Sequence, residues 1–293
     1  MSNAHSIKTS LLLANTQLKS KGFEAITAKL EAQLLLQHVL NVNRAWLIAH
    51  EHDALQANIH AAYGALVNRR VNGEPIAYIL GYREFYGLKF KVSIDTLIPR
   101  PDTETLVDAA LAKIPLQKVL KISDLGTGSG AIALAIAKNR PYIHVTALDA
   151  SQAALDIAIE NAQSLNINNV KFLLSDWFNA LKLNDEHKKF DVIVSNPPYI
   201  EALDVHLTQG DLRFEPISAL ASGADGLDDI RKIISQAPLH LNPQGWLMLE
   251  HGYNQAEQVS ALLKLANFSE IETIKDLGGN NRVTLGKFTQ PSF

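Results

Sequence analysis

Asn196, Pro197, Pro198 and Tyr199 form the stretch of this sequence whose residue types are best suited to chemistry. They follow the apolar run 190–195, which predicts a buried strand that ends where the tetrapeptide begins. Two consecutive prolines fix φ and remove two N–H donors, so the loop is stiff. It offers an amide side chain, an unpaired carbonyl and an aromatic ring. Such a loop can hold a planar nitrogen that carries two hydrogens.

A Gly-rich turn lies upstream of this loop and strengthens a functional interpretation. An ordinary strand followed by a Pro-rich turn would use the same loop residues, because Pro and Asn occur in loops of every kind. However, residues 118–123 predict a strand and residues 131–138 a helix, and between them run Gly126, Thr127, Gly128, Ser129 and Gly130. Strand, Gly-rich turn and helix are the context in which such a motif binds a ligand. The glycines let the backbone approach that ligand closely and leave N–H groups free at the helix start.

An acidic residue ends the next predicted strand. Asp149 follows residues 143–148 and lies nineteen residues beyond Gly130, near the usual distance to a ribose hydroxyl. A nicotinamide dehydrogenase would show a similar pattern. The Gly-x-Gly-x-Gly spacing differs from the dinucleotide fingerprint, however, and need not leave room for a pyrophosphate. The spacing therefore favours S-adenosylmethionine, and more strongly so together with residues 196–199.

Predicted strands and helices alternate along the second part of the chain. The strands are expected to begin near Val119, Ile143, Val170, Phe190, Gly245, Ile271 and Arg282. The helices are expected near residues 104–113, 130–139, 151–164, 225–240 and 254–266. Repeated β–α units predict an α/β fold, a mostly parallel sheet with helices on both faces. Ligands of such sheets bind outside the carboxyl ends of the strands. The Gly-rich turn, Asp149, residues 175–177 and residues 196–199 should therefore gather at one edge.

The first part of the chain predicts a small helical bundle. Its helices are expected up to Leu18, over residues 28–40 and over residues 57–70, with Ser6 or Thr9 and Thr27 as caps. The stretch 77–92 is aromatic and β-prone, which predicts a hairpin. Asp102 or Thr103 is expected to cap the helix that follows. We therefore divide the chain into a substrate-docking bundle (1–72), a β-hairpin linker (73–98) and a catalytic domain (99–293).

The composition limits the class of protein. The chain has 293 residues, of which 47% are hydrophobic and 19% charged, as is typical of a soluble chain with a good core. No apolar run reaches about 18 residues, so we expect no membrane span. Cys is absent, so we expect no disulfides, no thiolate chemistry and no metal. These features predict a cytoplasmic protein. The formal net charge of −3 argues against a surface built mainly for nucleic-acid phosphates.

Several stretches of the chain closely resemble one enzyme family. They are residues 74–81, residues 98–104 (Ile-Pro-Arg-Pro-Asp-Thr-Glu), the Gly-rich turn, Asn-Pro-Pro-Tyr at 196–199, residues 214–220 and residues 278–283. They are similar to the HemK/PrmC family, the protein-(glutamine-N5) methyltransferases that act on peptide chain release factors. The resemblance covers nearly the whole chain and implies a Rossmann-like class I methyltransferase domain. Asn-Pro-Pro-Tyr is shared with adenine-N6 methyltransferases, whereas residues 98–104 are more specific to this family.

The resemblance implies a substrate, the glutamine of the Gly-Gly-Gln motif in class I release factors. A carboxamide nitrogen is a poor nucleophile, because its lone pair is delocalised into the carbonyl. We expect the Asn196 side-chain oxygen and the Pro197 carbonyl each to accept one N–H of the substrate amide, and the Tyr199 ring to pack against its plane, with Pro198 completing the loop. Two acceptors would also accommodate positive charge developing on the nitrogen. Placing this nitrogen in line with the methyl group would then be the main catalytic effect.

The same resemblance allocates residues to S-adenosylmethionine and its product, S-adenosylhomocysteine. Residues 126–130 are expected to line the methionine portion, and Asp149 to accept from the ribose. Asp176 could accept from the adenine amino group, with Trp177 against the ring and Asn196 beside the methyl donor. Asp124 either orients the turn or touches ligand. The roles of Arg100, Glu104 and Glu215 stay open.

Other functions share parts of this pattern. A methyltransferase acting on a ribosomal-protein glutamine is the nearest alternative. A DNA or RNA adenine-N6 methyltransferase would use the same loop on a flipped base, but it should have a basic cleft or a recognition domain. A nucleotide-binding protein that does not methylate gives no reason for Asn196 and Tyr199 beside the cofactor. We therefore expect a release factor as partner, no direct nucleic-acid specificity, no membrane and a monomeric enzyme.

Overall fold

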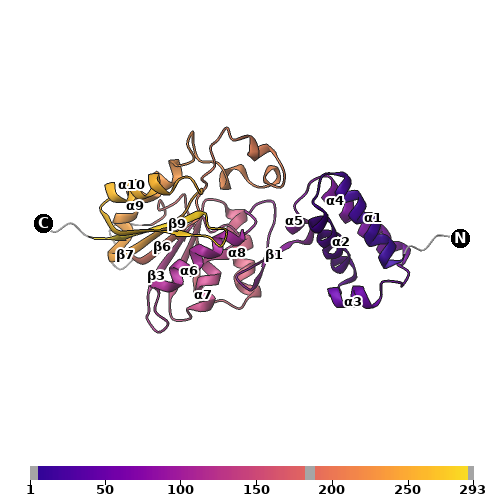
Figure 1. The fold of residues 1–293 in the computed structure, drawn as a ribbon. Helices are drawn as coiled ribbons and strands as arrows, with labels where there is room; N and C mark the ends of the chain where they lie inside the picture. The colour runs from indigo at the N-terminus through magenta and orange to yellow at the C-terminus, as the bar shows by residue number, and fades with distance from the viewer. Residues whose placement is uncertain (1–5, 182–188, 290–293) are drawn as a thin grey trace. The chain divides into compact units, whose positions relative to one another are not determined.

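A computed structural model describes residues 6–181 and 189–289. The chain divides into two compact units, Met1–Gly81 and Tyr82–Phe293, each of which is described by itself. Both units are drawn in Figure 1.

The first unit consists of helices. They are α1 (Ile7–Ser20), α2 (Ala25–Leu40), α3 (Arg44–Ala49), α4 (Ala57–Val71) and α5 (Ile76–Leu80). Their apolar faces meet in one core, which includes Leu18, Leu35 and Val67. Glu31 and Arg70 form a buried ion pair between α2 and α4, with Nε–Oε2 at 2.7 Å. The predicted helical bundle is therefore present.

Local details of this unit differ in part from the sequence expectations. Ser6 caps α1 as predicted, because its side chain accepts from the Thr9 N–H. Thr27 is not a cap, since α2 already begins at Ala25. The helix α3, capped by the Asn43 side chain, was not predicted. The expected hairpin over 77–92 was wrong in its first part, because residues from Ile76 to Leu80 form α5. Pro75 precedes this helix, and Gly81 ends it with a φ of 77°, a conformation that favours glycine.

The second unit is built on a seven-stranded sheet. Its strands are β3 (Lys121–Leu125), β4 (His144–Asp149), β5 (Val170–Leu174), β6 (Phe190–Ser195), β7 (Leu241–Glu250), β8 (Phe268–Lys275) and β9 (Asn281–Phe288). They lie in the order β5-β4-β3-β6-β7-β9-β8. β3 to β7 are parallel, and β9 pairs antiparallel with both β7 and β8. The prediction of a mostly parallel sheet is confirmed.

Helices cover both faces of this sheet, as Figure 1 shows. One face carries α6 (Glu104–Lys113), α7 (Ala131–Asn139) and α8 (Gln152–Ser164), and the other carries α9 (Asp228–His240) and α10 (Ala256–Leu265). Alternate residues of each strand enter opposite cores. In β6, Val192 and Val194 pack in the first core and Ile193 in the second. Continuous apolar strands are therefore explained by burial on both faces.

A short hairpin begins the second unit. Its strands are β1 (Tyr82–Phe85) and β2 (Leu88–Lys91), and Phe85 and Phe90 are buried in the core of the α6–α8 face. The Asn161 side chain of α8 accepts from the Lys91 N–H at 2.7 Å and donates to the carbonyls of Lys91 and Ser129. The hairpin is thus fastened to the Gly-rich turn.

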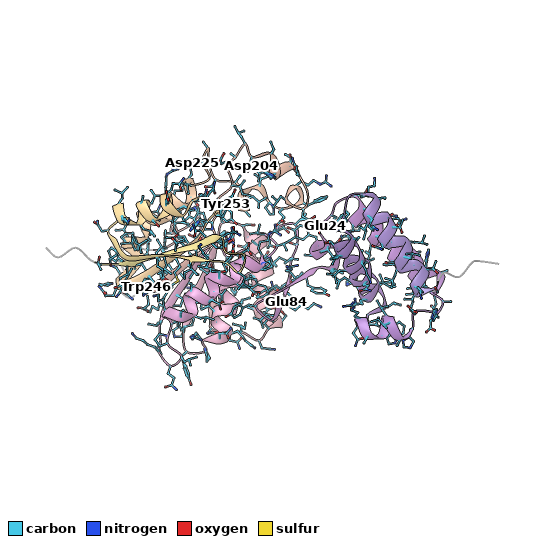
Figure 2. All side chains as sticks on the ribbon, in the orientation of Figure 1. Glu24, Glu84, Asp204, Asp225, Trp246 and Tyr253 are labelled. Carbon is cyan, nitrogen blue, oxygen red and sulfur yellow. The ribbon has the colours of Figure 1, made fainter. Side chains whose placement is uncertain are left out.

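A long segment joins β6 to α9. It contains the short 3-10 helices Val205–Thr208, Leu212–Phe214 and Ile217–Ala219. Figure 2 labels Asp204 and Asp225 on this segment. Asp225 forms an ion pair with Arg231 of α9, which fastens the end of the segment to the helix. The segment begins with Asn196–Tyr199, so its anchoring bears on the site.

Candidate active site

A cavity of about 600 Å³ lies at the carboxyl ends of β3 to β6. The residues of the Gly-rich turn, the strand-end acids and the Asn-Pro-Pro-Tyr loop were all predicted to gather here. Those that line the cavity are Gly126, Gly128, Asp149, Asp176, Trp177, Asn196 and Pro198. Thr127, Ser129, Gly130, Pro197 and Tyr199 were also predicted as site residues and are not among the lining residues. Four consecutive loops of a parallel sheet thus share one cavity.

The Gly-rich turn depends on glycine for its backbone path. Gly126, Gly128 and Gly130 have φ values of 69°, 55° and 82°, which residues with a side chain rarely adopt. The expectation of free N–H groups is wrong for much of this turn. Thr127 N–H donates to the Leu148 carbonyl, Gly128 N–H to Asp149 Oδ2 and Gly130 N–H to the Thr127 carbonyl. These N–H groups hold the conformation of the turn and are not free to bind a ligand. What the glycines offer a ligand is the close approach that the lack of a side chain allows.

Asp124 orients the Gly-rich turn from behind. It is fully buried, and its Oδ2 accepts from Thr127 Oγ1 at 2.6 Å and from the Ala133 N–H at 3.1 Å. Its Oδ1 has no partner among the described residues. Burial disfavours the charged carboxylate and raises the pKa of Asp124 to about 7. Of the two roles left open, orientation of the turn is the one its contacts support.

This buried acid should make stability depend on pH. The raised folded-state pKa means that the contribution of Asp124 is fully present below the unfolded pKa, about 3.9, and is lost as pH rises through about 7. Asp124→Asn keeps an acceptor for Thr127 and removes the titration. We expect it to abolish about 2–4 kcal/mol of the decline in unfolding free energy between pH 4.5 and 8.

Denaturant unfolding of wild type and Asp124→Asn at both pH values measures this difference. Exposed Asp156 on α8 supplies the control, since Asp156→Asn should keep the wild-type decline. Part of the decline should survive in Asp124→Asn, because burial also raises the pKa of Glu250 to about 7. Identical pH dependence in wild type and Asp124→Asn would contradict the assignment.

Two strand-end acids and a tryptophan form one side of the cavity. Asp149 accepts the N–H groups of Gly128 and Ser151 at 2.8 and 2.9 Å, which sets its carboxylate at the cavity wall. Burial raises the pKa of Asp149, and these amides oppose the shift. Asp176 is exposed at the same wall. The Trp177 ring lies over the Gly126 backbone, since a Cβ on that glycine would stand 3.4 Å from it.

The Asn-Pro-Pro-Tyr loop is anchored on both sides. Before it, Ser195 Oγ donates to the Leu125 carbonyl at 2.7 Å, which ties β6 to β3. At its last residue, the Tyr199 carbonyl accepts from Gln255 Nε2 at 3.0 Å. The Asn196 side chain donates through Nδ2 to Thr103 Oγ1 at 3.3 Å. Its Oδ1 is thereby directed away from Thr103, on a side chain that lines the cavity.

The Tyr199 ring packs with the core of the α9–α10 face. Its hydroxyl lies 3.4 Å from Glu250 Oε1, at the end of β7. Burial, with the negative charge of Glu250 beside it, raises the pKa of Tyr199, so the phenol stays neutral. Neutral Tyr199 therefore stiffens the loop from its buried side.

The residues whose roles stayed open make structural contacts. Glu215 is buried and forms an ion pair with Arg100, and its Oε2 accepts the Ile98 N–H at 3.0 Å. Burial raises the pKa of Glu215, and the Arg100 guanidinium opposes that shift. This pair fastens the stretch before α6 to the segment after β6. Glu104 accepts the Tyr86 N–H at 2.9 Å and so holds the hairpin to α6.

Some lining residues escaped the sequence analysis. They are Ile94, Asp95, Thr96, Leu97, Ala150, Ser151, Ala154, Pro216, Ser218, Ala219, Ala221 and Asp229, whereas Ser175 was expected at this edge and does line the cavity. Most of them are Ala, Ser or Thr, residue types that give no clue to a site. Asp229 positions two neighbouring side chains, because its Oδ1 accepts from Trp177 Nε1 at 3.2 Å and its Oδ2 from Ser222 Oγ at 2.7 Å. A carboxylate at the start of α9 was the one feature that could have indicated it.

The structure describes the ranges 6–181 and 189–289. Within them no group of three or more His, Cys, Asp or Glu residues is placed to hold a metal ion. The helices of those ranges include none long and apolar enough to cross a membrane.

Comparison with known proteins defines the class first. Residues 116–284 match a family described as a methyltransferase domain, and residues 11–81 match one described as the PrmC N-terminal domain. A methyltransferase structure from Pyrococcus furiosus superimposes with a TM-score of 0.51 at 19% identity, over 76% of this chain and 98% of that chain. The chain is thus a methyltransferase with the class I fold, as its sequence predicted.

Curated relatives then define the particular family. The release factor glutamine methyltransferase of Xylella fastidiosa strain Temecula1 is 49% identical over 259 residues, 88% of this chain and 93% of that protein. The enzyme of that name from Pseudomonas aeruginosa is 46% identical over 277 residues, 94% of this chain and 97% of its own. The chain belongs to the release factor glutamine methyltransferase family, which confirms the resemblance seen in its motifs.

Proposed function

We propose that this enzyme transfers a methyl group from S-adenosylmethionine to the side-chain amide nitrogen of the glutamine in the Gly-Gly-Gln motif of class I peptide chain release factors. One observation carries the proposal. Asn196 lines the cavity with its Nδ2 already committed to Thr103 Oγ1, so its Oδ1 remains to accept an N–H from a ligand. An acceptor of fixed orientation beside a nucleoside-type pocket suits a planar NH₂ substrate.

The cavity fits S-adenosylmethionine, which supplies an electrophilic methyl group on a sulfonium when it is bound. About 600 Å³ is enough for a ligand of that size. The Gly126 and Gly128 backbones would lie against the methionine portion, and the Asp149 carboxylate would accept from ribose hydroxyls. Exposed Asp176 would accept from the adenine amino group, with the Trp177 ring beside the base.

The loop residues would do the positioning on the substrate side. Asn196 Oδ1 and the Pro197 carbonyl would each accept one N–H, which fixes the amide plane. The prolines keep this carbonyl in place, because their φ angles are restricted. As positive charge develops on the attacking nitrogen, both acceptors stabilise it. The proton can leave afterwards, so no strong base is needed before attack, and alignment is the main catalytic contribution.

A labelling experiment tests this proposal. The protein is incubated with methyl-labelled S-adenosylmethionine and, in separate reactions, purified class I release factor, ribosomes or DNA. We expect label on the release factor and its loss when the Gly-Gly-Gln glutamine is replaced by alanine. Label on ribosomes alone would move the substrate to a ribosomal-protein glutamine. Label on DNA but not on release factor would overturn the proposal in favour of adenine methylation.

The remaining features of the proposal follow from this substrate. A release factor is met in the cytoplasm, so we place the enzyme there, as a monomer without nucleic-acid specificity of its own. The helices of residues 1–72 would dock the release factor. They carry seven Lys or Arg against four Asp or Glu, an excess of basic residues that suits an acidic partner surface. Residues 73–98 would link them to the catalytic domain of residues 99–293.

A further inference from the structure

Thr103 directly precedes α6 and was one of the two residues expected to cap it. Threonine in an N-cap position normally turns its hydroxyl back to the helix N–H groups. Thr103 precedes α6 as the last residue of the 3-10 helix Pro101–Thr103, and in the described structure its side chain makes no cap bond. It is only 4% exposed, and its Oγ1 instead accepts from Asn196 Nδ2 at 3.3 Å across 93 positions of sequence. The hydroxyl is therefore directed to the candidate site.

Glu250 lies on the other side of this hydroxyl. It ends β7 and is 1% exposed, and burial raises its pKa while the nearby Thr103 hydroxyl favours its ionised form. Its Oε1 lies 3.4 Å from the Tyr199 hydroxyl, and its Oε2 finds no partner in the described part of the chain. Arg282 and Asp102 are the charged groups that act on it, with attraction from the first and repulsion from the second.

The donor and acceptor capacities of these groups favour one arrangement. An ionised carboxylate only accepts hydrogen bonds, so the Thr103 hydroxyl would direct its single proton toward Glu250. The lone pairs of that hydroxyl can then face only a donor, and the donor end of the Asn196 carboxamide is its NH₂ group. The carbonyl end of Asn196 must consequently point the other way.

We propose that Thr103 and Glu250 are positioning residues that set the orientation of the Asn196 carboxamide and present its Oδ1 to the substrate amide. The proposal deepens the glutamine methyltransferase function and rests on it. It gives the Pro-Arg-Pro-Asp-Thr-Glu stretch a role in catalysis beyond joining two parts of the chain. If Thr103 and Glu250 did not hold it, the Asn196 side chain could turn its NH₂ group toward the substrate. The NH₂ groups of Asn196 and of the substrate amide, both donors, would then face each other.

Thr103→Val and Thr103→Ser form the test pair. Valine keeps the shape and removes the hydroxyl, whereas serine keeps the hydroxyl and removes the methyl group. We expect Thr103→Val to lower kcat/KM for release factor about 10- to 100-fold, with the Kd for S-adenosylmethionine, measured by calorimetry, changed less than about threefold. Thr103→Ser should recover most of the activity.

Thr284→Val controls for the loss of a buried threonine hydroxyl. Thr284 is fully buried and bonded to His251 Nε2 at 2.7 Å, so its variant should lose stability but keep kcat. The proposed role of Thr103 is wrong if Thr103→Val retains kcat/KM within about twofold. It is also wrong if Thr103→Ser loses as much kcat/KM as Thr103→Val. Failure of the underlying function is distinct, since wild type itself would then leave release factor unlabelled.

The pH dependence of turnover gives a second readout. Protonated Glu250 can donate as well as accept, which releases the constraint on Thr103, so wild-type kcat should fall as pH drops through about 7. Glu250→Gln should give low activity without this decline. Asp124, whose pKa is also raised to about 7, could cause a similar decline, so Asp124→Asn is the control and should retain it. A decline that persists in Glu250→Gln overturns the role of Glu250.

Discussion

Asn196→Ala is expected to lower kcat about 100- to 1,000-fold while S-adenosylmethionine binds with nearly unchanged affinity. The substitution removes an acceptor that would act on the substrate amide as its nitrogen becomes positively charged. In the proposed function, Gly126, Asp149 and Trp177 form the cofactor side of the cavity and the Asn196 side chain faces the substrate. The loss should therefore fall on the chemical step.

Single-turnover methylation of release factor and calorimetry of S-adenosylmethionine binding separate the two effects. Asn196→Asp is the matched variant, because it keeps an acceptor oxygen and loses the N–H donor to Thr103 Oγ1. It should retain more activity than Asn196→Ala. If Asn196→Ala weakens cofactor binding as much as it slows turnover, the main role of Asn196 is to build the cofactor pocket, and the substrate role fails.

Gly226→Ala is expected to disable the enzyme although Gly226 touches no predicted motif in sequence. Its φ is 73°, and a Cβ there would stand 2.2 Å from the Tyr199 carbonyl oxygen and 2.8 Å from Gln255 Nε2. The oxygen is a backbone atom of the Asn-Pro-Pro-Tyr loop, so it cannot move without the loop. We expect unfolding free energy to fall by about 2–4 kcal/mol and turnover to fall at least about 100-fold.

Gly210→Ala separates steric displacement from backbone strain. Gly210 has a φ of 53°, and a Cβ there would meet no heavy atom of the described residues within 4 Å. Its variant should lose about 1 kcal/mol from the left-handed conformation alone and keep its turnover. Denaturant unfolding and methylation rates of both variants provide the comparison. Equal effects of the two substitutions would show that the steric clash with the Tyr199 carbonyl adds nothing to the effect of backbone strain.

Much of the fold follows from local features of the sequence. The predicted strand starts near Val119, Ile143, Val170 and Phe190 lie within two residues of the observed β3, β4, β5 and β6. Apolar runs, Gly-rich turns and Pro-rich loops act over a few neighbouring residues, so they can be interpreted without tertiary contacts. The error at Ile76–Leu80 has a related cause. Aromatic residues favoured a strand there, while Pro75 and Gly81 bounded a single helical turn.

The sequence predicted some of the residues that line the cavity and missed others. Gly126, Asp149 and Asn196 follow strands directly, so the parallel sheet alone places them at one edge. Pro216 lies in the segment after β6 and Asp229 at the start of α9, and the path of that segment depends on the Arg100–Glu215 ion pair and on Asp225. Those contacts join distant residues, and no local pattern indicates them.

The Asn-Pro-Pro-Tyr loop itself shows both kinds of information. The residue types and the strand before them indicated by themselves a rigid acceptor for a planar NH₂ group, because proline restricts φ and asparagine carries an acceptor oxygen. Tertiary structure alone decided which end of the Asn196 amide faces the cavity. In our proposal that choice depends on Thr103, which precedes α6, and on Glu250 at the end of β7. The direction of a hydrogen bond depends on groups that packing brings together from distant parts of the chain, so it cannot be inferred from spacing in the sequence.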